Sequence, residues 1–224
     1  MSLALEFYKN ISDNSERNAQ CEYVDKLLQE HFLFDKIEFI ETGVSSGNYD
    51  NFGLYFGKLV EETNGIYNTV DISEKFLDDA RKSFEKLLPT LNVNLIHSDS
   101  VQYLNLYQGQ PNLVHLDSYD LDITNPIPSM LHHWLEFIAI KDKMPKGSFL
   151  LIDDNYMKGT VVYWNIYDEN KNLIDVKPTD INYEMLGKGA LIYFAIKDGK
   201  INDWEILGSH YLPGLCLKLI LKKI

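Results

Sequence analysis

The stretch IEFIETGVSSG, residues 37–47, decides the fold. It begins as a mainly apolar run typical of a buried strand, and Glu41 then opens a turn that contains Gly43 and Gly47. A second candidate strand, 66–70, ends in Asp71. An acid at the tip of the second strand of an α/β unit can hold the two free hydroxyls of a ribose with its carboxylate. Together the two segments predict a nucleoside-binding crevice.

Strands and helices alternate through the first two thirds of the chain, after an opening helix predicted over 18–34. Ser73 is expected to cap one helix at its start, and Pro89 to stop it. Five strands joined by crossovers predict an α/β fold, a Rossmann-like, doubly wound and mostly parallel sheet. The strands are expected at 36–41, 65–71, 93–97, 112–117 and 148–153, and the helices between them at 49–63, 73–88, 101–106 and 128–141.

The last third changes character and predicts antiparallel structure. One hairpin is expected over 161–176 and a second over 190–211, turning at Asp198-Gly199. The apolar tail 212–224 is expected to add a strand at a sheet edge or to pack on a partner, which leaves a homo-oligomer open. The chain length and the hydrophobic content of 45% predict a single domain, 1–224, with a helical segment at 1–35 and an insertion at 156–188 that shapes the substrate site.

The charge of the chain bears on its partners. The formal net charge is −12, and phosphate-rich nucleic acid binds mainly through Lys and Arg, so a small molecule is favoured and no nucleic-acid partner is expected. The N-terminus lacks a signal-like segment, and no uncharged apolar run approaches the ~20 residues that span a bilayer. The expectation is a cytoplasmic protein with no membrane partner.

This order of parts resembles the class I S-adenosylmethionine-dependent methyltransferases, whose parallel sheet is completed by an antiparallel hairpin. The resemblance covers roughly 36–211 and rests on the order of five segments: FIETGVSSG, TVDISEKFLDDARK, LIHSDSVQYL, NLVHLDSYD and GSFLLIDDNY. It implies an enzyme whose cofactor, S-adenosylmethionine, contacts Glu41, Gly43, Ser46, Gly47, Asp71, Asp99 and Ser100. In this arrangement Asp71 takes the ribose hydroxyls and Asp99 faces the adenine.

Within that superfamily, LDSYD and LIDDN are similar to segments of the metal-dependent O-methyltransferases of the catechol and macrocin types. That resemblance implies Mg²⁺ held by Asp117, Asp153 and Asp154, with Asn155 as a further oxygen ligand. It also implies O-methylation of a small hydroxylated acceptor, because a bound cation lowers the pKa of a chelated hydroxyl. The catechol enzymes carry a catalytic Lys after the first metal ligand, where this chain has Asp120, so no general base is implied.

Purely structural roles compete with these functional assignments. His132 and His133 are candidate catalytic bases, but a surface or packing role fits them as well. The Asp153-Asp154 pair could cap the next segment in solvent, and His115, inside an apolar strand, is expected to be a core histidine.

Two further functions stay open. A non-catalytic protein that binds a nucleoside or S-adenosylmethionine would use the same crevice. An NAD(P)-dependent oxidoreductase is less favoured, because the GxGxxG phosphate cradle is absent from the sequence.

Overall fold

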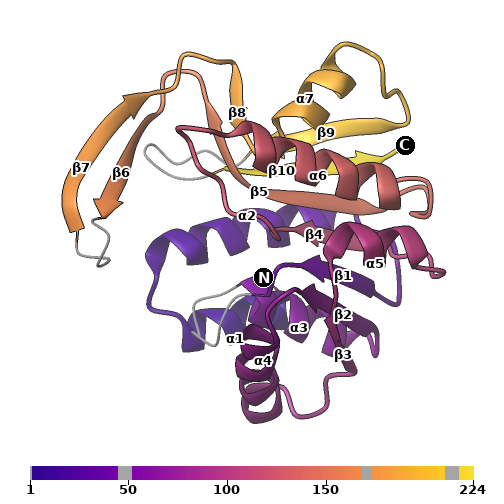
Figure 1. The fold of residues 1–224 in the computed structure, drawn as a ribbon. Coiled ribbons are helices and arrows are strands. Elements are labelled where there is room, and N and C mark those ends of the chain that lie inside the picture. Colours follow the sequence, from indigo (N-terminus) through magenta and orange to yellow (C-terminus); the bar gives the residue numbers. More distant parts are fainter. Residues whose placement is uncertain (1, 45–51, 168–172, 210–216) are drawn as a thin grey trace.

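The computed structural model describes residues 2–44, 52–167, 173–209 and 217–224. Within them, one sheet has the strand order β3-β2-β1-β4-β5-β10-β9, and β8 pairs with β5 beside this path (Figure 1). The predicted α/β fold with a mostly parallel, doubly wound sheet is confirmed. The parallel strands are β1 (Glu38–Thr42), β2 (Ile66–Asp71), β3 (Val93–His97), β4 (Leu113–Leu116) and β5 (Phe149–Met157).

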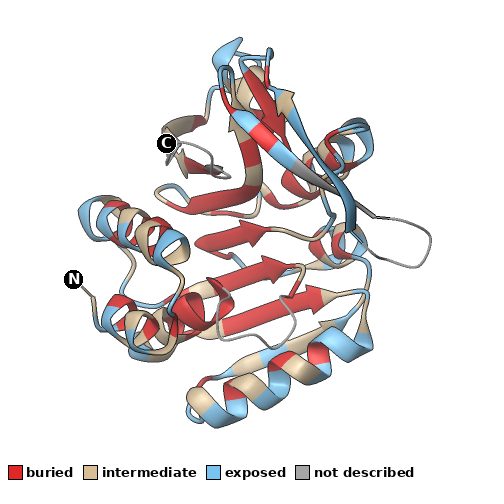
Figure 2. Ribbon diagram, turned by 90° about the vertical axis from the view of Figure 1, so that its left-hand side faces the viewer, coloured by how far each residue is buried: buried red, intermediate tan, exposed pale blue. Residues whose placement is uncertain are grey.

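Helices cover both faces of the sheet. Successive strand residues point to opposite faces, so Phe39 enters one apolar core and Ile40 the other. Figure 2 shows the strands buried between the two layers. One layer contains α1 (Leu3–Ile11), α2 (Ser15–His31), α3 (Phe52–Glu62) and α4 (Glu74–Leu87); the other contains α5 (Ser100–Leu106), α6 (Ile127–Ile140) and α7 (Ala190–Lys197). The predicted cap is present, because Ser73 Oγ accepts a hydrogen bond from the N–H of Phe76.

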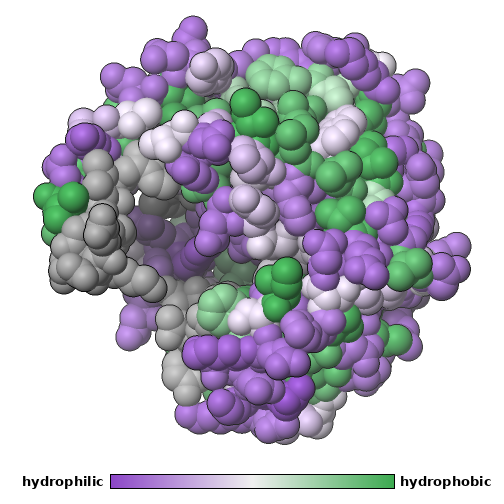
Figure 3. Space-filling model, viewed as in Figure 1, coloured by the Kyte–Doolittle hydropathy of each residue, from purple (hydrophilic) through white to green (hydrophobic). Residues whose placement is uncertain are grey.

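Helix α6 is apolar on its outer face as well as on its inner face. Ile127, Leu131, Leu135 and Ile138 are exposed, and Figure 3 shows apolar side chains gathered over this helix. Its inner face nevertheless buries a charged residue, Glu136. The hydropathy pattern alone therefore could not show which side of α6 faces the sheet. Among the described helices, none combines the length and apolarity needed to cross a bilayer.

The C-terminal third corrects two predictions. The segment expected as the first strand of the second hairpin is helix α7, because an unbroken apolar run of this length does not distinguish strand from helix by period. The hairpin is instead formed by β9 (Trp204–Ser209) and β10 (Leu217–Lys223). The tail is not at an edge either: β10 lies between β5 and β9, antiparallel to both.

The first predicted hairpin is confirmed and longer than expected. Strands β6 (Val161–Tyr167) and β7 (Leu173–Asp180) pair only with each other and project from the body of the molecule (Figure 1). Strand β8 (Met185–Gly187) follows and returns the chain to the end of β5. A small apolar cluster secures the hairpin base: Ile123, Val162, Ile181 and Leu186.

Candidate functional site

A cavity of about 290 Å³ opens where the parallel strands end. The strand order reverses between β1 and β4, and such a switch point at the carboxyl edge is where open α/β sheets bind ligands. Residues that follow β1, β2, β3 and β4 all reach the cavity. Its lining consists of Gly43, Val70, Asp71, Ile72, Ser98, Asp99, Ser100, Ser118, Tyr119 and His132.

Gly43 allows a close approach between two segments of the backbone. Its φ is +78°, and a Cβ there would lie 2.3 Å from the carbonyl oxygen of Asp117. Only glycine fits this backbone beside the end of β4. The next N–H, of Val44, donates to Asp71 Oδ2 at 2.9 Å, which ties the turn to the end of β2.

Asp71 lies at the tip of β2 and faces the cavity, as the sequence predicts. Its other oxygen accepts a hydrogen bond from the N–H of Ser73 at 2.6 Å. Each carboxylate oxygen has two lone pairs, so both can still accept a hydroxyl donor from a ligand. This is the hydrogen-bonding capacity that a ribose with two free hydroxyls requires.

Asp99 and Ser100 line the cavity at the end of β3. Asp99 Oδ1 accepts from the N–H of Gln102 at 2.8 Å and so caps α5. Ser100 is buried, and its hydroxyl lies 3.0 Å from His132 Nε2. Two other predicted cofactor residues, Ser46 and Gly47, fall outside the described residues.

Glu41 is not among the residues that line this cavity. It is buried within the sheet, where Tyr67 and Thr69 donate hydrogen bonds to its Oε2 at 2.8 and 3.2 Å. Burial raises the pKa of Glu41 to about 8 despite these donors. Direct contact between Glu41 and a cofactor stays a prediction.

The two neighbouring histidines of α6 lie in different surroundings. His132 lies on the cavity wall and stacks near Tyr119, with ring centroids 5.3 Å apart. His133 is fully buried, its Nδ1 is 2.8 Å from the carbonyl oxygen of Ser129, and burial lowers its pKa to about 4. Of the two histidines, only His132 lines this cavity, and it does so beside Ser100.

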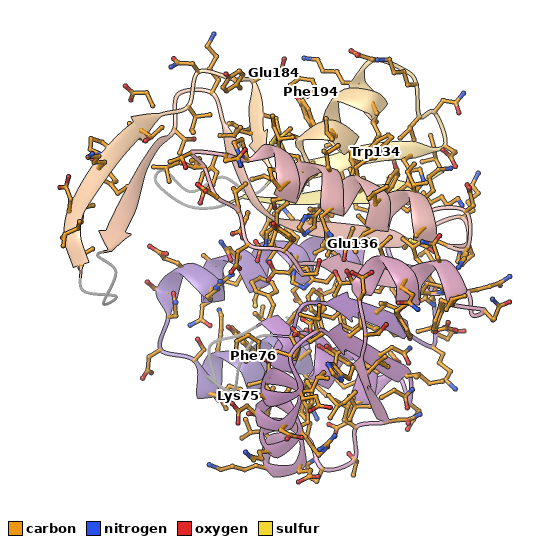
Figure 4. All side chains as sticks on the ribbon, viewed as in Figure 1. Lys75, Phe76, Trp134, Glu136, Glu184 and Phe194 are labelled. Carbon is orange, nitrogen blue, oxygen red and sulfur yellow. The ribbon has the colours of Figure 1, made fainter. Side chains whose placement is uncertain are left out.

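A buried acid stands behind His132. Glu136 points from α6 towards the sheet, away from Trp134 on the same helix (Figure 4). Its Oε1 accepts a hydrogen bond from Ser118 at 2.7 Å and lies 3.6 Å from His132 Nε2. Burial lowers the pKa of His132, but Glu136 outweighs that effect, so the net shift is upward. Glu136 thus supports two residues of the cavity wall from behind.

Two of the three predicted metal ligands, Asp117 after β4 and Asp153 within β5, lie close together. Single ligand atoms of His115, Asp117 and Asp153 lie within 4.8 Å of one another, and Asp154 follows directly. The space between these carboxylates, however, is taken by lysine. Lys188 Nζ lies 2.5 Å from Asp117 Oδ1 and 2.8 Å from Asp154 Oδ2, and its side chain is only 1% exposed.

A second lysine, Lys218 at the start of β10, completes the cluster. Its Nζ lies 2.7 Å from Asp153 Oδ2 and 3.1 Å from His115 Nε2, and its side chain is also 1% exposed. An ammonium group only donates, so His115 Nε2 is the acceptor and its Nδ1–H points to Glu41 Oε1, 3.4 Å away. Burial holds the pKa of His115 well below its usual range, so it is a neutral core histidine, as expected.

This donor set does not fit Mg²⁺. Three carboxylates already face three cationic groups, because Arg17 Nη1 also lies 3.6 Å from Asp153. Asn155, expected as a further oxygen ligand, is buried, and its Oδ1 accepts the N–H of Gly189 at 2.7 Å.

The sequence interpretation missed Lys188 and Lys218 as site residues. A signal was available in Gly187-Lys188-Gly189. Gly187 has φ +135°, and a Cβ on it would lie 2.1 Å from the carbonyl oxygen of Asp154. A lysine between two glycines at the end of a strand has a backbone that can approach another strand closely.

No family model matches the chain, and no curated protein matches its sequence. Solved structures do match its fold. The "putative methyltransferase" SMU.1697c of Streptococcus mutans, solved in complex with SAH, is 13% identical with a TM-score of 0.57 and covers 91% of this chain and 97% of its own. An rRNA methylase from Streptococcus thermophilus is 14% identical with a TM-score of 0.53, over 91% of this chain and 96% of its own.

A third match is a SAM-dependent methyltransferase from Methanosarcina mazei, 10% identical with a TM-score of 0.51, over 88% of this chain and 97% of its own. At such identities the likeness is one of fold. The chain has the Rossmann-like fold of S-adenosylmethionine-dependent methyltransferases, with a parallel sheet completed by an antiparallel hairpin.

Proposed function

We propose that this protein is a methyltransferase that uses S-adenosylmethionine. The observation that carries the proposal is the cavity at the switch point of the sheet, which joins the positive-φ turn at Gly43 to the acid at Asp71. Asp71 would bind the ribose hydroxyls, and Asp99, Ser100 and His132 lie where the adenine would be held. The cofactor supplies a methyl group on a sulfonium, and the protein supplies alignment of the acceptor.

For the acceptor we propose a small hydroxylated molecule. The side chains of Asp117 and Asp154 are 31% and 35% exposed at the edge of the sheet, so their oxygens can accept hydrogen bonds from hydroxyl groups. Asp117 adjoins Ser118 on the cavity wall, which brings these acceptors next to the proposed cofactor. Magnesium assistance, the finer part of the sequence interpretation, has no support in the lysine-filled cluster.

RNA is the second candidate acceptor, because two structures of the same fold are named as an rRNA methylase or a putative one, which weakly opposes the expectation of no nucleic-acid partner. The acidic residues near the cavity disfavour RNA as the acceptor. Asp71 and Asp99 line the opening, Asp120 and Asp122 lie on the exposed loop after β4, and all four would repel phosphate. We therefore rank the small acceptor first.

Calorimetric titration with S-adenosylhomocysteine tests the proposal directly. We expect micromolar binding by the wild type, weakened about 10- to 100-fold by Asp71→Ala, because hydrogen bonds to a carboxylate are lost. Asp78→Ala is the matched control, since Asp78 is an exposed acid on α4 that pairs with Arg81. Equal affinity in the Asp71 variant, or no binding by the wild type, would rule out this cofactor site.

Transfer of a labelled methyl group to a panel of phenols, polyols and amines then addresses catalysis. Turnover with hydroxylated compounds is the expected result. Tight binding of S-adenosylhomocysteine without methyl transfer to any compound would favour the non-catalytic binding protein.

A further inference from the structure

We infer that Lys188 and Lys218 hold the aspartate cluster together with their own ammonium groups, in the place where a magnesium ion was expected, and that this cluster takes no divalent cation. This inference rests on the proposed function, because it concerns the residues that hold Asp117 and Asp154 in the proposed acceptor site. Its test by metal binding does not depend on methyl transfer, so the two ideas can fail separately.

Charge balance is the first argument. Lys188, Lys218 and Arg17 lie within 3.6 Å of Asp117, Asp153 and Asp154, so three basic groups face three acidic groups. A divalent cation would add two positive charges to a group in which each basic side chain already faces a carboxylate. Burying unpaired charge is costly, so the ion would have to displace a lysine.

The burial of the two lysines opposes their displacement by a metal ion. Each side chain is 1% exposed, and Lys218 Nζ also lies 4.0 Å from the ring centroid of Phe52. Lys188 Nζ contacts two carboxylates at once, those of Asp117 and Asp154, so a metal ion would have to break both contacts. A metal ion that took the place of either ammonium group would have to move a buried lysine side chain.

The backbone around Lys188 is built for this contact. The N–H of Lys188 donates to the carbonyl oxygen of Asp154 at 3.2 Å, and Gly189 donates to Asn155 Oδ1 at 2.7 Å. A Cβ on Gly187 would collide with the Asp154 carbonyl, and one on Gly189 would lie 2.8 Å from Leu219 Cδ2. Strand β5 contributes as well, because Asp154 has φ +51°, an uncommon value for a residue other than glycine.

Lys188 is therefore a positioning residue for the cavity wall. It holds Asp117, whose carbonyl oxygen packs against Gly43 and whose neighbour Ser118 lines the cavity. Removing the ammonium would leave Asp117 and Asp154 facing each other uncompensated. The ends of β4 and β5 would then separate or recruit another cation.

Titration of metal-stripped protein with Mn²⁺, followed by electron paramagnetic resonance, tests for metal binding. The melting temperature is measured in EDTA and in Mg²⁺ at equal ionic strength. For the wild type we expect no saturable Mn²⁺ binding and no Mg²⁺-dependent shift. Saturable binding of one ion that is lost in Asp153→Asn would overturn the inference.

The Lys188→Met variant tests whether a metal ion can replace the missing ammonium group. We expect its melting temperature to fall by roughly 10 °C, because one partner of a buried ion pair is removed, and Mg²⁺ or Mn²⁺ to restore part of the loss. Lys188→Arg should remain stable and indifferent to metal. Lys200→Met is the control, since Lys200 is 74% exposed.

If Lys188→Met does not fold, the double variant Lys188→Met/Asp117→Asn keeps the test decisive. Removing both charges of a true pair should recover folding and S-adenosylhomocysteine affinity relative to the single variant. No recovery, or a Lys188→Met protein as stable as the wild type, would contradict the positioning role.

Discussion

His132 shows how a neighbour decides what a single residue can do. It shares a helix turn with His133, yet one ring lies on the cavity wall and the other is buried against the carbonyl of Ser129. The pKa of His132 is raised because Glu136, fully buried behind it, favours the charged ring more than burial disfavours it. Its charge therefore depends on an acid four residues further along α6.

A pH-dependent stability follows from this pair. The folded pKa of His132 is raised, so its stabilising contribution is fully present below its ordinary pKa of about 6.5 and is lost as pH rises through the raised value. We expect His132→Gln to lower the free energy of unfolding in mildly acidic buffer and to have much less effect at alkaline pH. Urea unfolding at several pH values measures this.

His31→Gln is the control for that series, because His31 is a half-exposed histidine beside Glu30 near the end of α2. A loss of stability in His132→Gln that is the same at every pH would show that packing rather than charge is responsible.

At the scale of elements, the β6–β7 hairpin is nearly independent of the cavity. It pairs with no other strand, and its anchoring cluster lies at its base. Most of β7 is exposed, including Leu173, Ile174 and Val176. The cavity lining, by contrast, comes from residues that follow β1 to β4 and from α6.

Replacing 161–180 by an Asn-Gly turn tests that independence. Thr160 and Ile181 are already joined by a backbone hydrogen bond of 2.9 Å, so a two-residue turn can close the chain there. We expect S-adenosylhomocysteine affinity within about twofold of the wild type, and loss of methyl transfer to the acceptor if 156–188 shapes its site as predicted. Calorimetry and labelled-methyl transfer measure the two effects.

A large loss of cofactor-product affinity in that variant would show that the hairpin supports the cavity after all. Unchanged turnover would remove the insertion from the acceptor site.

At the scale of the molecule, the acidic surface separates the two candidate acceptors. The net charge of −12 opposes any polyanion, whatever the names of structures with the same fold. We expect no filter retention of ribosomal or transfer RNA at physiological salt, because affinity for phosphates depends on released counterions and hence on basic contacts. Micromolar RNA binding that weakens steeply with added salt would contradict this prediction.

Much of the fold could be predicted from the sequence. The alternation of apolar strands with amphipathic helices predicts the parallel sheet, and the segments around Gly43, Asp71, Asp99 and Ser100 point to the crevice because these signals are local. The strand predicted over the residues of α7 is wrong, since its apolar run has no clear period and only packing against the sheet selects the helix.

The sequence by itself determined which segments form the parallel strands and which acidic residues follow them. Only the tertiary structure decided what those acids meet. Lys188 and Lys218 lie 71 and 65 residues along the chain from Asp117 and Asp153, and β8 and the central β10 bring them into contact. Local sequence patterns carry no information about such distant charges, so the resemblance to metal-dependent enzymes implied a metal ion beside carboxylates that contact Lys188 and Lys218 in the folded chain.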